Sequence, residues 1–596
     1  MCGIAAVFDR TGRGVDSDAL ARVSTHMARR GPDSHGVWTA PDGRAGLAHR
    51  RLAIIDLSAC GAQPMHSADG RLAVTFNGEI YNYRALRTRL EADGARFASE
   101  SDTEVLLHLY ARHGAGLVDH LRGMYAFALW DAERGGLLLA RDPYGIKPLY
   151  VADDGRAFRA ASQVKALLAG GGIDTEPEPA GHAGFFLWGS VPEPYTLYRG
   201  IRALPAGHTL WVDAGGPRAA VPFASVPDAF RSGTRTAPDG VPGGALGAAP
   251  GSLREALLDS VRAHLVADVP VGVFLSAGRD SSALAALAAE MGGTLKTVTL
   301  GFEEFRGTPD DEVPLAEAVA RHVGADHQTV WTTARDFADA RADILAAMDQ
   351  PTLDGVNTYF VSRAAAQTGL KVALSGVGGD ELFGGYPSFR EVPRLVRAMR
   401  PVPAGLGRAA RVATAPLLRR VTSPKAAGLA EYGGTWGGAY LLRRALFMPY
   451  ELPAVLGRDM ARAGLAALRP LDALNAAAAR QGSDHARVAA MESVQYMRNQ
   501  LLRDTDWASM AHSLEVRTPL VDWALLGALA PDVACAPERV SKAALAATPR
   551  PALPDAVLSR PKTGFSIPVR EWLAGEAHAE RGLRGWTRTV YDAFTG

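Results

Sequence analysis

The chain has 596 residues, which is too long for a single hydrophobic core and predicts two large domains. Its 64 Lys and Arg residues balance its 63 Asp and Glu residues, so the net charge of +1 offers no basic surface for nucleic acid or an acidic membrane. Three widely spaced cysteines show neither the pattern of a zinc site nor that of a disulfide framework. No apolar run reaches the roughly 18 residues of a membrane span, and charged residues replace the hydrophobic stretch of a signal peptide. We therefore expect a cytoplasmic protein that acts on small molecules.

The second residue, Cys2, becomes the N-terminal residue once the initiator methionine is removed. A terminal cysteine combines a thiol nucleophile with a free α-amino group, whose pKa of about 7.7 suits proton transfer at neutral pH. Taken alone, Cys2 has two interpretations, because a buried terminal cysteine can also serve packing only.

Residues 1–212 alternate short apolar segments with amphipathic ones, which predicts a layered domain of sheets and helices. The clearest expected strands are 3–8, 71–76, 124–130 and 136–140, and the clearest expected helices are 17–29 and 102–113. Residues 213–250 are rich in Gly, Pro and Ala and lose the apolar periodicity, which is typical of a connector. We place the domain boundary there.

Residues 251–596 begin with an alternation of helices and buried strands, which predicts a doubly wound parallel sheet. The expected elements are a helix over 252–265, a strand over 271–275, a helix over 281–291 and a strand over 296–301. From about residue 390 the chain is rich in Ala, Leu and Arg at helical spacing, so we expect a helical C-terminal region.

Five short motifs follow Cys2 in the first domain. They are Arg-Gly-Pro-Asp at 30–33, His-Arg-Arg-Leu at 49–52, Phe-Asn-Gly-Glu-Ile-Tyr-Asn at 76–82, Ser-Asp-Thr-Glu at 101–104 and Arg-Asp-Pro-Tyr-Gly at 141–145. Singly, such motifs are typical of turns, and Asn-Gly of a hairpin tip. Together and in this order, they resemble the glutamine amidotransferase domain of the N-terminal-nucleophile class. The resemblance implies a four-layer αββα fold in which Cys2 is the nucleophile that releases ammonia from glutamine.

The resemblance also implies roles for the residues around Cys2. Asn77, through its side chain, and Gly78, through its backbone N–H, would form an oxyanion hole, in which one donor is typically worth about 2.7–4 kcal/mol. Arg51 would bind the α-carboxylate of glutamine through its fork of donors, while Glu79 and Asp102 would bind the α-ammonium group. Asn77 is thus expected to contact glutamine as well.

The segment 271–282 predicts a buried strand, a tight loop and the start of a helix, an arrangement that binds anions such as phosphate. It resembles the pyrophosphate loop of enzymes that adenylate a carboxylate, whose usual pattern is Ser-Gly-Gly-x-Asp-Ser. Segments 371–386, 506–522 and 560–565 resemble further signatures of the glutamine-hydrolysing asparagine synthetase family. The resemblance therefore covers nearly the whole chain and implies an ATP pyrophosphatase domain.

By this resemblance, Asp280 and Asp380 would hold Mg²⁺ with the pyrophosphate. Val298 and Leu300 would flank the adenine, and Lys542 would neutralise phosphate charge. The residues expected around ATP are Leu275, Ser276, Gly278, Asp280, Ser281, Val298, Leu300, Ser375, Gly376 and Lys542.

The implied reaction converts ATP and a carboxylic acid, by default aspartate, into an acyl-adenylate. Ammonia then forms the amide and releases AMP. Because water competes with ammonia for the adenylate, we expect a sealed path between the domains. The family habit of dimerising also implies a possible homodimer.

Four positions depart from the family pattern or add to it. Ala277 replaces a glycine of the loop, and its Cβ would cost about 1–2 kcal/mol if the position needed a positive φ. Val377 replaces a glutamate that is thought to take a proton from ammonia, a role left to water or Glu381. Arg279 would either bind phosphate or face solvent. Gln163, which replaces another glutamate, is expected near the domain seam.

Three functions remain open from the sequence. The first is an asparagine synthetase, and the second performs the same chemistry on another carboxylate of polysaccharide or secondary-metabolite biosynthesis. The third is a glutaminase or scaffold that has lost the synthetase reaction, which the retained Asp280 and Asp380 argue against. Segment 351–359 is either part of the acceptor pocket or only the loop before a helix.

Overall fold

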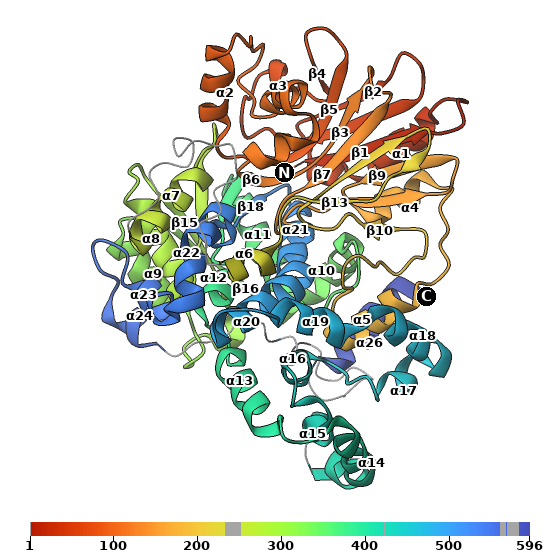
Figure 1. The fold of residues 1–596 in the computed structure, drawn as a ribbon. Helices are drawn as coiled ribbons and strands as arrows, with labels where there is room; N and C mark the ends of the chain where they lie inside the picture. The colour runs from red at the N-terminus through yellow and green to blue at the C-terminus, as the bar shows by residue number, and fades with distance from the viewer. Residues whose placement is uncertain are drawn as a thin grey trace.

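The computed structural model describes residues 2–232, 252–421, 423–560, 568, 572 and 583–595, except for the side chains of residues 232, 404 and 415–421. Figure 1 shows the first domain above the second, with most of the later helices below. Residues 233–250 of the expected connector and 561–565 of the last expected motif lie outside the described residues.

The first domain contains two antiparallel sheets that face each other. One sheet has the order β10 (Arg202–Ala203), β8 (Tyr150–Asp153), β9 (Ala157–Ala161), β1 (Gly3–Asp9), β3 (Ala45–Arg51), β2 (Ser34–Thr39). The other has the order β12 (Gly216–Pro217), β11 (His208–Asp213), β7 (Gly136–Arg141), β6 (Gly123–Asp131), β5 (Leu72–Ile80), β4 (Met65–His66), and β13 (Val221–Pro222) also pairs with β11.

Helices cover the outer face of each sheet. On the first sheet lie α1 (Ser17–His26) and α4 (Val164–Gly170), and on the second lie α2 (Tyr83–Ala92) and α3 (Glu104–His113). Because side chains alternate along a strand, Ile4 and Phe8 pack between the sheets with Trp130, whereas Ala5 packs under the helices with Leu20. The expected four-layer αββα fold is confirmed.

The strand β5 is longer than the sequence suggested. It continues from Leu72 through Asn77 and Gly78 to Ile80 and pairs with β6 over its whole length. The Asn-Gly pair therefore lies within a strand and not at a hairpin tip. Pairing with β6 overrides the local turn preference of these two residues.

The second domain is built on a five-stranded parallel sheet. Its order is β16 (Asp326–Thr332), β15 (Lys296–Phe302), β14 (Val271–Phe274), β17 (Val372–Leu374), β18 (Glu515–Arg517). On one face pack α7 (Leu253–His264), α8 (Arg279–Ala289) and α9 (Val313–His322), and on the other α10 (Ala334–Ala347) and α11 (Val356–Gln367). The order reverses between β14 and β17, and such a switch point is where ligands bind in doubly wound sheets.

The expected helical C-terminal region is also confirmed. The short helix α12 (Gly379–Phe383) precedes this region. The region contains α13 (Ser388–Met399), α14 (Ala404–Val421), α15 (Leu429–Tyr432), α16 (Trp436–Arg444), α17 (Leu452–Leu456), α18 (Arg458–Leu468), α19 (Pro470–Ala478), α20 (Asp484–Met491), the π-helix η6 (Glu492–Leu502), α21 (Arg503–Met510), α22 (Trp523–Cys535), α23 (Lys542–Ala546), α24 (Asp555–Ser559) and α26 (Arg584–Thr595). Within the described ranges, no helix combines the length and apolar character needed to cross a bilayer.

Segments of the first half of the chain also pack on these later helices. Helix α5 (Pro179–Trp188) lies against α18, and α6 (Val226–Ser232) lies against α22. The strands β12 and β13 continue the second sheet beyond residue 212. The boundaries at residues 212 and 250 stay predictions.

Buried ion pairs join the two domains. Arg30 donates to both carboxylate oxygens of Asp506 on α21, at 2.6 and 2.9 Å, and both side chains are at least 94% buried, with 3% and 6% exposure. Arg122 on the first domain pairs with Asp522, which precedes α22. Two buried pairs of this kind hold the domains in one orientation, because breaking either pair leaves an uncompensated charge.

Candidate active sites

Cys2 lies at the start of β1, beside the middle of β5. Its backbone nitrogen donates to Asn77 Oδ1 at 2.8 Å, and its carbonyl accepts from Arg30 Nε at 3.0 Å. The thiol is buried, with Sγ 4.0 Å from the Leu52 carbonyl oxygen. Burial raises the pKa of this thiol, so the thiol needs a nearby base to become a nucleophile.

Asn77 and Gly78 present two donors next to Cys2. Asn77 is fully buried, and its Nδ2 has no hydrogen-bond partner in the part of the chain that the structure describes. Gly78 has a φ of +151°, and a Cβ there would lie 2.0 Å from the Met124 carbonyl oxygen. Only glycine fits this position. An orphaned amide beside a strained glycine suits an oxyanion hole, which needs donors that remain free until charge develops.

A cavity of about 30 Å³ opens beside Cys2, and we call it the small cavity. The sequence-predicted residues that line it are Cys2, Arg51, Gly78, Glu79 and Asp102. It is also lined by Glu515, which belongs to β18 of the second domain. The sequence motif that contains Glu515 gave no sign of this placement.

The charged groups of the small cavity are already engaged in the structure. Arg51 donates from Nη1 to the Ser58 carbonyl oxygen at 2.9 Å. Asp102 Oδ2 accepts from the Ile80 backbone N–H at 2.8 Å, and burial raises the pKa of this carboxyl to about 7. Asp102 therefore accepts backbone hydrogen bonds from Ile80 and from Thr103.

Arg517 connects this cavity to the second domain. Its Nη2 lies 3.2 Å from Glu79 Oε1, and its Nε donates to Glu515 Oε1 at 2.6 Å. Arg517 is fully buried, and burial raises the pKa of Glu79. Sequence reasoning did not anticipate this cluster, because nothing in either motif specifies a partner more than 400 positions away.

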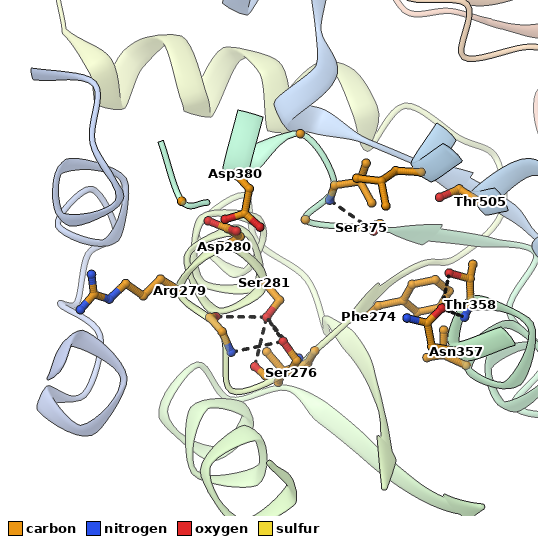
Figure 2. Close-up of a pocket in the computed structure, with 18 of the residues that line it drawn as sticks. Phe274, Ser276, Arg279, Asp280, Ser281, Asn357, Thr358, Ser375, Asp380 and Thr505 are labelled. Carbon is orange, nitrogen blue, oxygen red and sulfur yellow. Dashed lines mark hydrogen bonds between the residues drawn. The ribbon is translucent and has the colours of Figure 1, made fainter. Parts of the chain in front are cut away.

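A second cavity, of about 640 Å³, lies at the carboxyl ends of β14, β15 and β17, and we call it the large cavity. Figure 2 shows its lining, with the loop after β14 on one side and α11 on the other. The structure brings together all the residues expected around ATP and Mg²⁺, namely Leu275, Ser276, Gly278, Asp280, Ser281, Val298, Leu300, Ser375, Gly376, Asp380 and Lys542.

The loop after β14 is closed by two hydroxyl groups. Ser276 Oγ lies 2.8 Å from Ser281 Oγ and accepts from the Gly278 backbone N–H at 3.2 Å. The loop ends at Gly278, the N-cap of α8, so the positive end of this helix dipole faces the cavity. Ala277 does not have a positive φ. The condition under which its Cβ would strain the loop is therefore not met.

Lys542 lies between the two carboxylates expected to bind magnesium. Its Nζ is 2.5 Å from Asp280 Oδ1 and 2.7 Å from Asp380 Oδ1. Two carboxylates that already share one cation fit Mg²⁺, which takes oxygen ligands and completes its shell with phosphate and water. Within the described residues no group of three His, Cys, Asp or Glu could hold a metal.

Arg279 adopts neither expected orientation. Its side chain points away from Asp280 and Asp380 in Figure 2, and its Nη2 donates to the Leu558 carbonyl oxygen on α24. Gln163 precedes α4, whose backbone N–H groups at residues 164 and 165 donate to Asp349 of the second domain at 2.8 and 2.9 Å. Gln163 thus begins a helix at the domain seam.

Val377 lines the large cavity, as does Glu381 one turn further along. Glu381 is 2% exposed and accepts from the Tyr386 hydroxyl at 2.9 Å. Burial raises the pKa of this carboxyl to about 7. An ionisable group therefore lies in the same cavity as the valine.

The short strand β18 contributes to both cavities. Glu515 lines the small cavity, Val516 lines the large one, and Arg517 pairs with Glu79. The Arg517 carbonyl oxygen also accepts from the Ser375 backbone N–H at 2.8 Å. Three consecutive residues thus touch both sites.

Comparison with known proteins gives a separate family match for each half of the chain. Residues 1–222 match the glutamine amidotransferase domain, and residues 252–589 match asparagine synthase. The chain belongs to the asparagine synthase family. A putative glutamine-hydrolysing asparagine synthetase of Mycobacterium tuberculosis is 36% identical over 97% of this chain and 89% of the relative. Glutamine-hydrolysing asparagine synthetase 1 of Bacillus subtilis is 31% identical over 99% and 90%.

A third relative carries a different name. Amidase chry2 of Gibberella zeae is 32% identical over 65% of this chain and 60% of the relative. Family membership and the two cavities identify a glutamine-dependent amide synthetase that uses ATP as a substrate. The carboxylate that it amidates is not given by the family.

Proposed function

We propose that the small cavity hydrolyses glutamine and that the large cavity adenylates a carboxylate and receives the ammonia. The observation that carries this proposal is β18, because its three residues touch both cavities. Two sites on the two sides of one strand can exchange ammonia with little exposure to water.

In the small cavity, the Cys2 thiol attacks the carboxamide carbon of glutamine and its own α-amino group takes the thiol proton. Asn77 Nδ2 and the Gly78 N–H donate to the oxyanion. The α-amino group then passes the proton to the leaving nitrogen, so that collapse of the intermediate releases ammonia and leaves a thioester. Water then hydrolyses the thioester to glutamate. Arg51 binds the α-carboxylate, and Asp102 with Glu79 binds the α-ammonium.

Support for this assignment comes from the positions of the donors. The orphaned Asn77 Nδ2 and the glycine that tolerates no Cβ both lie beside Cys2. An oxyanion hole needs such preformed donors, because reorganising them during the reaction would cost catalysis.

In the large cavity, the loop after β14 holds the ATP phosphates through Ser276, Ser281 and the N-terminus of α8. Val298 and Leu300 flank the adenine, while Ser375 and Gly376 lie near the adenylate. Asp280 and Asp380 would hold Mg²⁺, which would neutralise negative charge on the phosphates. Lys542 contributes a second positive charge at the same place.

The carboxylate attacks the α-phosphorus and displaces pyrophosphate. Ammonia then attacks the acyl carbon, loses a proton, and AMP departs. Aspartate is the default acceptor, and another biosynthetic carboxylate is the alternative. A cytoplasmic location and a homodimer stay predictions.

The test measures AMP and pyrophosphate release with a panel of carboxylic acids, for the wild type and Cys2→Ala, with glutamine or ammonium as the nitrogen source. We expect Cys2→Ala to lose glutamine-dependent release and to keep ammonium-dependent release. Loss of both would refute separate sites. Absence of release with every acid, while glutamine is still hydrolysed, would favour a protein that has lost the synthetase reaction.

A further inference from the structure

The large cavity has a wall that the ATP site does not use. After the phosphate loop, the magnesium carboxylates and the adenine-flanking residues are assigned, five polar side chains of the lining remain grouped, and we call them the acidic wall. Its members are Asp354, Glu381, Tyr386, Tyr496 and Asp504.

The acidic wall is contiguous and contains three carboxyl groups. The Tyr386 hydroxyl donates to Glu381 at 2.9 Å, and the rings of Tyr386 and Tyr496 are in contact with their centroids 5.8 Å apart. Asp504 is 2% exposed, and the charge of Asp354 helps to raise its pKa after the larger effect of burial. These groups therefore act on one another and on anything placed between them.

The hydrogen-bond donors to these carboxyl groups are neutral in the described residues. Asp354 accepts from its neighbouring backbone N–H at 2.9 Å. Asp504 accepts from the Thr352 hydroxyl and the Trp507 indole, each at 2.9 Å. The second oxygen of Glu381 has no hydrogen-bond partner in this part of the chain. A buried, unpaired carboxylate oxygen that faces a cavity favours a cationic ligand.

The cationic side chains that line the large cavity pair with groups outside the acidic wall. Among the described lining residues these are Arg279, Lys542 and Arg560. Lys542 is shared by the two carboxylates proposed for magnesium, Arg560 pairs with Glu312 at 3.3 Å, and Arg279 donates to α24. None of the three pairs with a carboxyl group of the acidic wall. Lys542 acts on Glu381 through its charge alone, after the larger effect of burial, so a second carboxylate on the acceptor would face acids that form no ion pair with these cations.

Arg444 contacts the two tyrosine rings of the acidic wall. The Arg444 guanidinium stacks on both rings, 3.9 and 4.3 Å from their centroids, and pairs with Glu492 at 2.9 Å. Tyr496 and Glu492 belong to the π-helix η6, and π-helical turns occur frequently at functional sites. The Arg444 charge is thus engaged by Glu492 and by the two rings, and Arg444 is not among the described residues that line the large cavity.

We propose that the acceptor carries an ammonium group that the acidic wall binds, and that the carboxylate to be adenylated is its only carboxylate in the large cavity. This inference rests on the proposed amide synthesis. Free aspartate brings the ammonium group but also a second carboxylate, for which the acidic wall offers no ion-pair partner. An amino acid with a single carboxylate, or a larger molecule with such an end, would place its ammonium group at the acidic wall without a second carboxylate beside it.

The test compares acids of matched length with the full chain, ATP, Mg²⁺ and ammonium, and it measures pyrophosphate release. Ammonium acids are represented by β-alanine and 6-aminohexanoate, dicarboxylates by succinate and adipate, and neutral-tailed acids by propionate and hexanoate, with aspartate alongside. We expect kcat/KM for one ammonium acid to exceed that for its matched dicarboxylate and neutral-tailed acid, and that for aspartate, at least tenfold.

The Asp354→Asn substitution tests the acidic wall alone, because Asp354 is not among the residues assigned to ATP or magnesium. We expect this variant to reduce the advantage of the ammonium acid over its neutral-tailed match at least fivefold, mainly through KM, with kcat nearly unchanged. Asp339→Asn is the matched control, because Asp339 lies on α10 with 74% of its side chain exposed, and it should change nothing.

The outcomes separate this inference from the proposed function. Preference for aspartate or a dicarboxylate, or an Asp354→Asn variant that keeps the full discrimination, overturns the inference and leaves amide synthesis intact. Pyrophosphate release with only those acids that lack an ammonium group would also overturn the inference and leave amide synthesis intact. Release with no acid at all overturns the proposed function and the inference together.

Discussion

Replacing Arg517 by methionine tests whether the buried cluster at the domain seam holds the two sites together. The guanidinium donates to the His264 and Val266 carbonyl oxygens at 2.8 and 2.6 Å, and contacts Glu79 and Glu515 at 3.2 and 2.6 Å. Methionine fills much of the same volume but removes every one of these donors. The substitution leaves buried carboxylates without their shared cation.

The expected magnitude follows from the burial of the pair. Glu79 is 4% exposed and Arg517 is fully buried, and removing one partner of a buried ion pair costs about 3–5 kcal/mol. We count Glu79 only, because Glu515 keeps other interactions. Arg517→Met should therefore lower the free energy of unfolding by about 3–5 kcal/mol, measured by denaturant unfolding.

A double substitution separates charge from packing. Glu79→Gln removes the stranded charge, so Arg517→Met with Glu79→Gln should recover at least half of the stability lost by Arg517→Met alone. Arg199→Met is the control, because its ion pair with Glu176 is 54% and 65% exposed, and such pairs are worth at most about 1 kcal/mol. An Arg517→Met variant as stable as the control, or a double variant without recovery, would refute this account of the seam.

Three further predictions concern single positions. Gly78→Ala places a Cβ 2.0 Å from the Met124 carbonyl oxygen, so glutamine hydrolysis should fall about 10²–10³-fold, while ammonium-dependent pyrophosphate release persists. Ala277→Gly should not raise the rate of that release, because Ala277 does not have a positive φ; a clear gain would show that its Cβ limits the loop. Burial raises the pKa of Asp102 to about 7, so the KM for glutamine should fall as pH rises through 7, and Asp102→Asn should abolish this dependence. Because this folded-state pKa exceeds the unfolded value of 3.8, ionisation of Asp102 costs stability as pH rises from about 4 to 7, and Asp102→Asn should remove that loss in denaturant unfolding.

The sequence predicts the parts of the sites that lie within one continuous motif. The loop from Leu275 to Ser281 is such a case, because a strand, a tight turn and a helix start are local features. Its placement opposite Ser375 and Gly376 follows from the parallel order of β14 and β17. These contacts could therefore be expected from pattern and topology together.

The remaining parts depend on contacts that no local pattern encodes. The pairing of Glu79 with Arg517 joins two strands of different sheets, and the acidic wall combines residues of four separate segments. The Asn-Gly pair at residues 77–78 was a hairpin signal by propensity, but its pairing with β6 keeps it inside a strand. In each case tertiary packing decides between options that the local sequence leaves equal.

The position of β18 gives a physical reason why two reactions can share so short an element. Side chains of consecutive strand residues point to opposite faces, so a strand at the seam between two domains presents Glu515 to one cavity and Val516 to the other. One residue of the strand contacts both domains. The Arg517 side chain pairs with Glu79, and the Arg517 carbonyl oxygen accepts from the Ser375 N–H. A shift of β18 would therefore either carry Glu79 and Ser375 with it or lengthen these contacts beyond hydrogen-bond and ion-pair range.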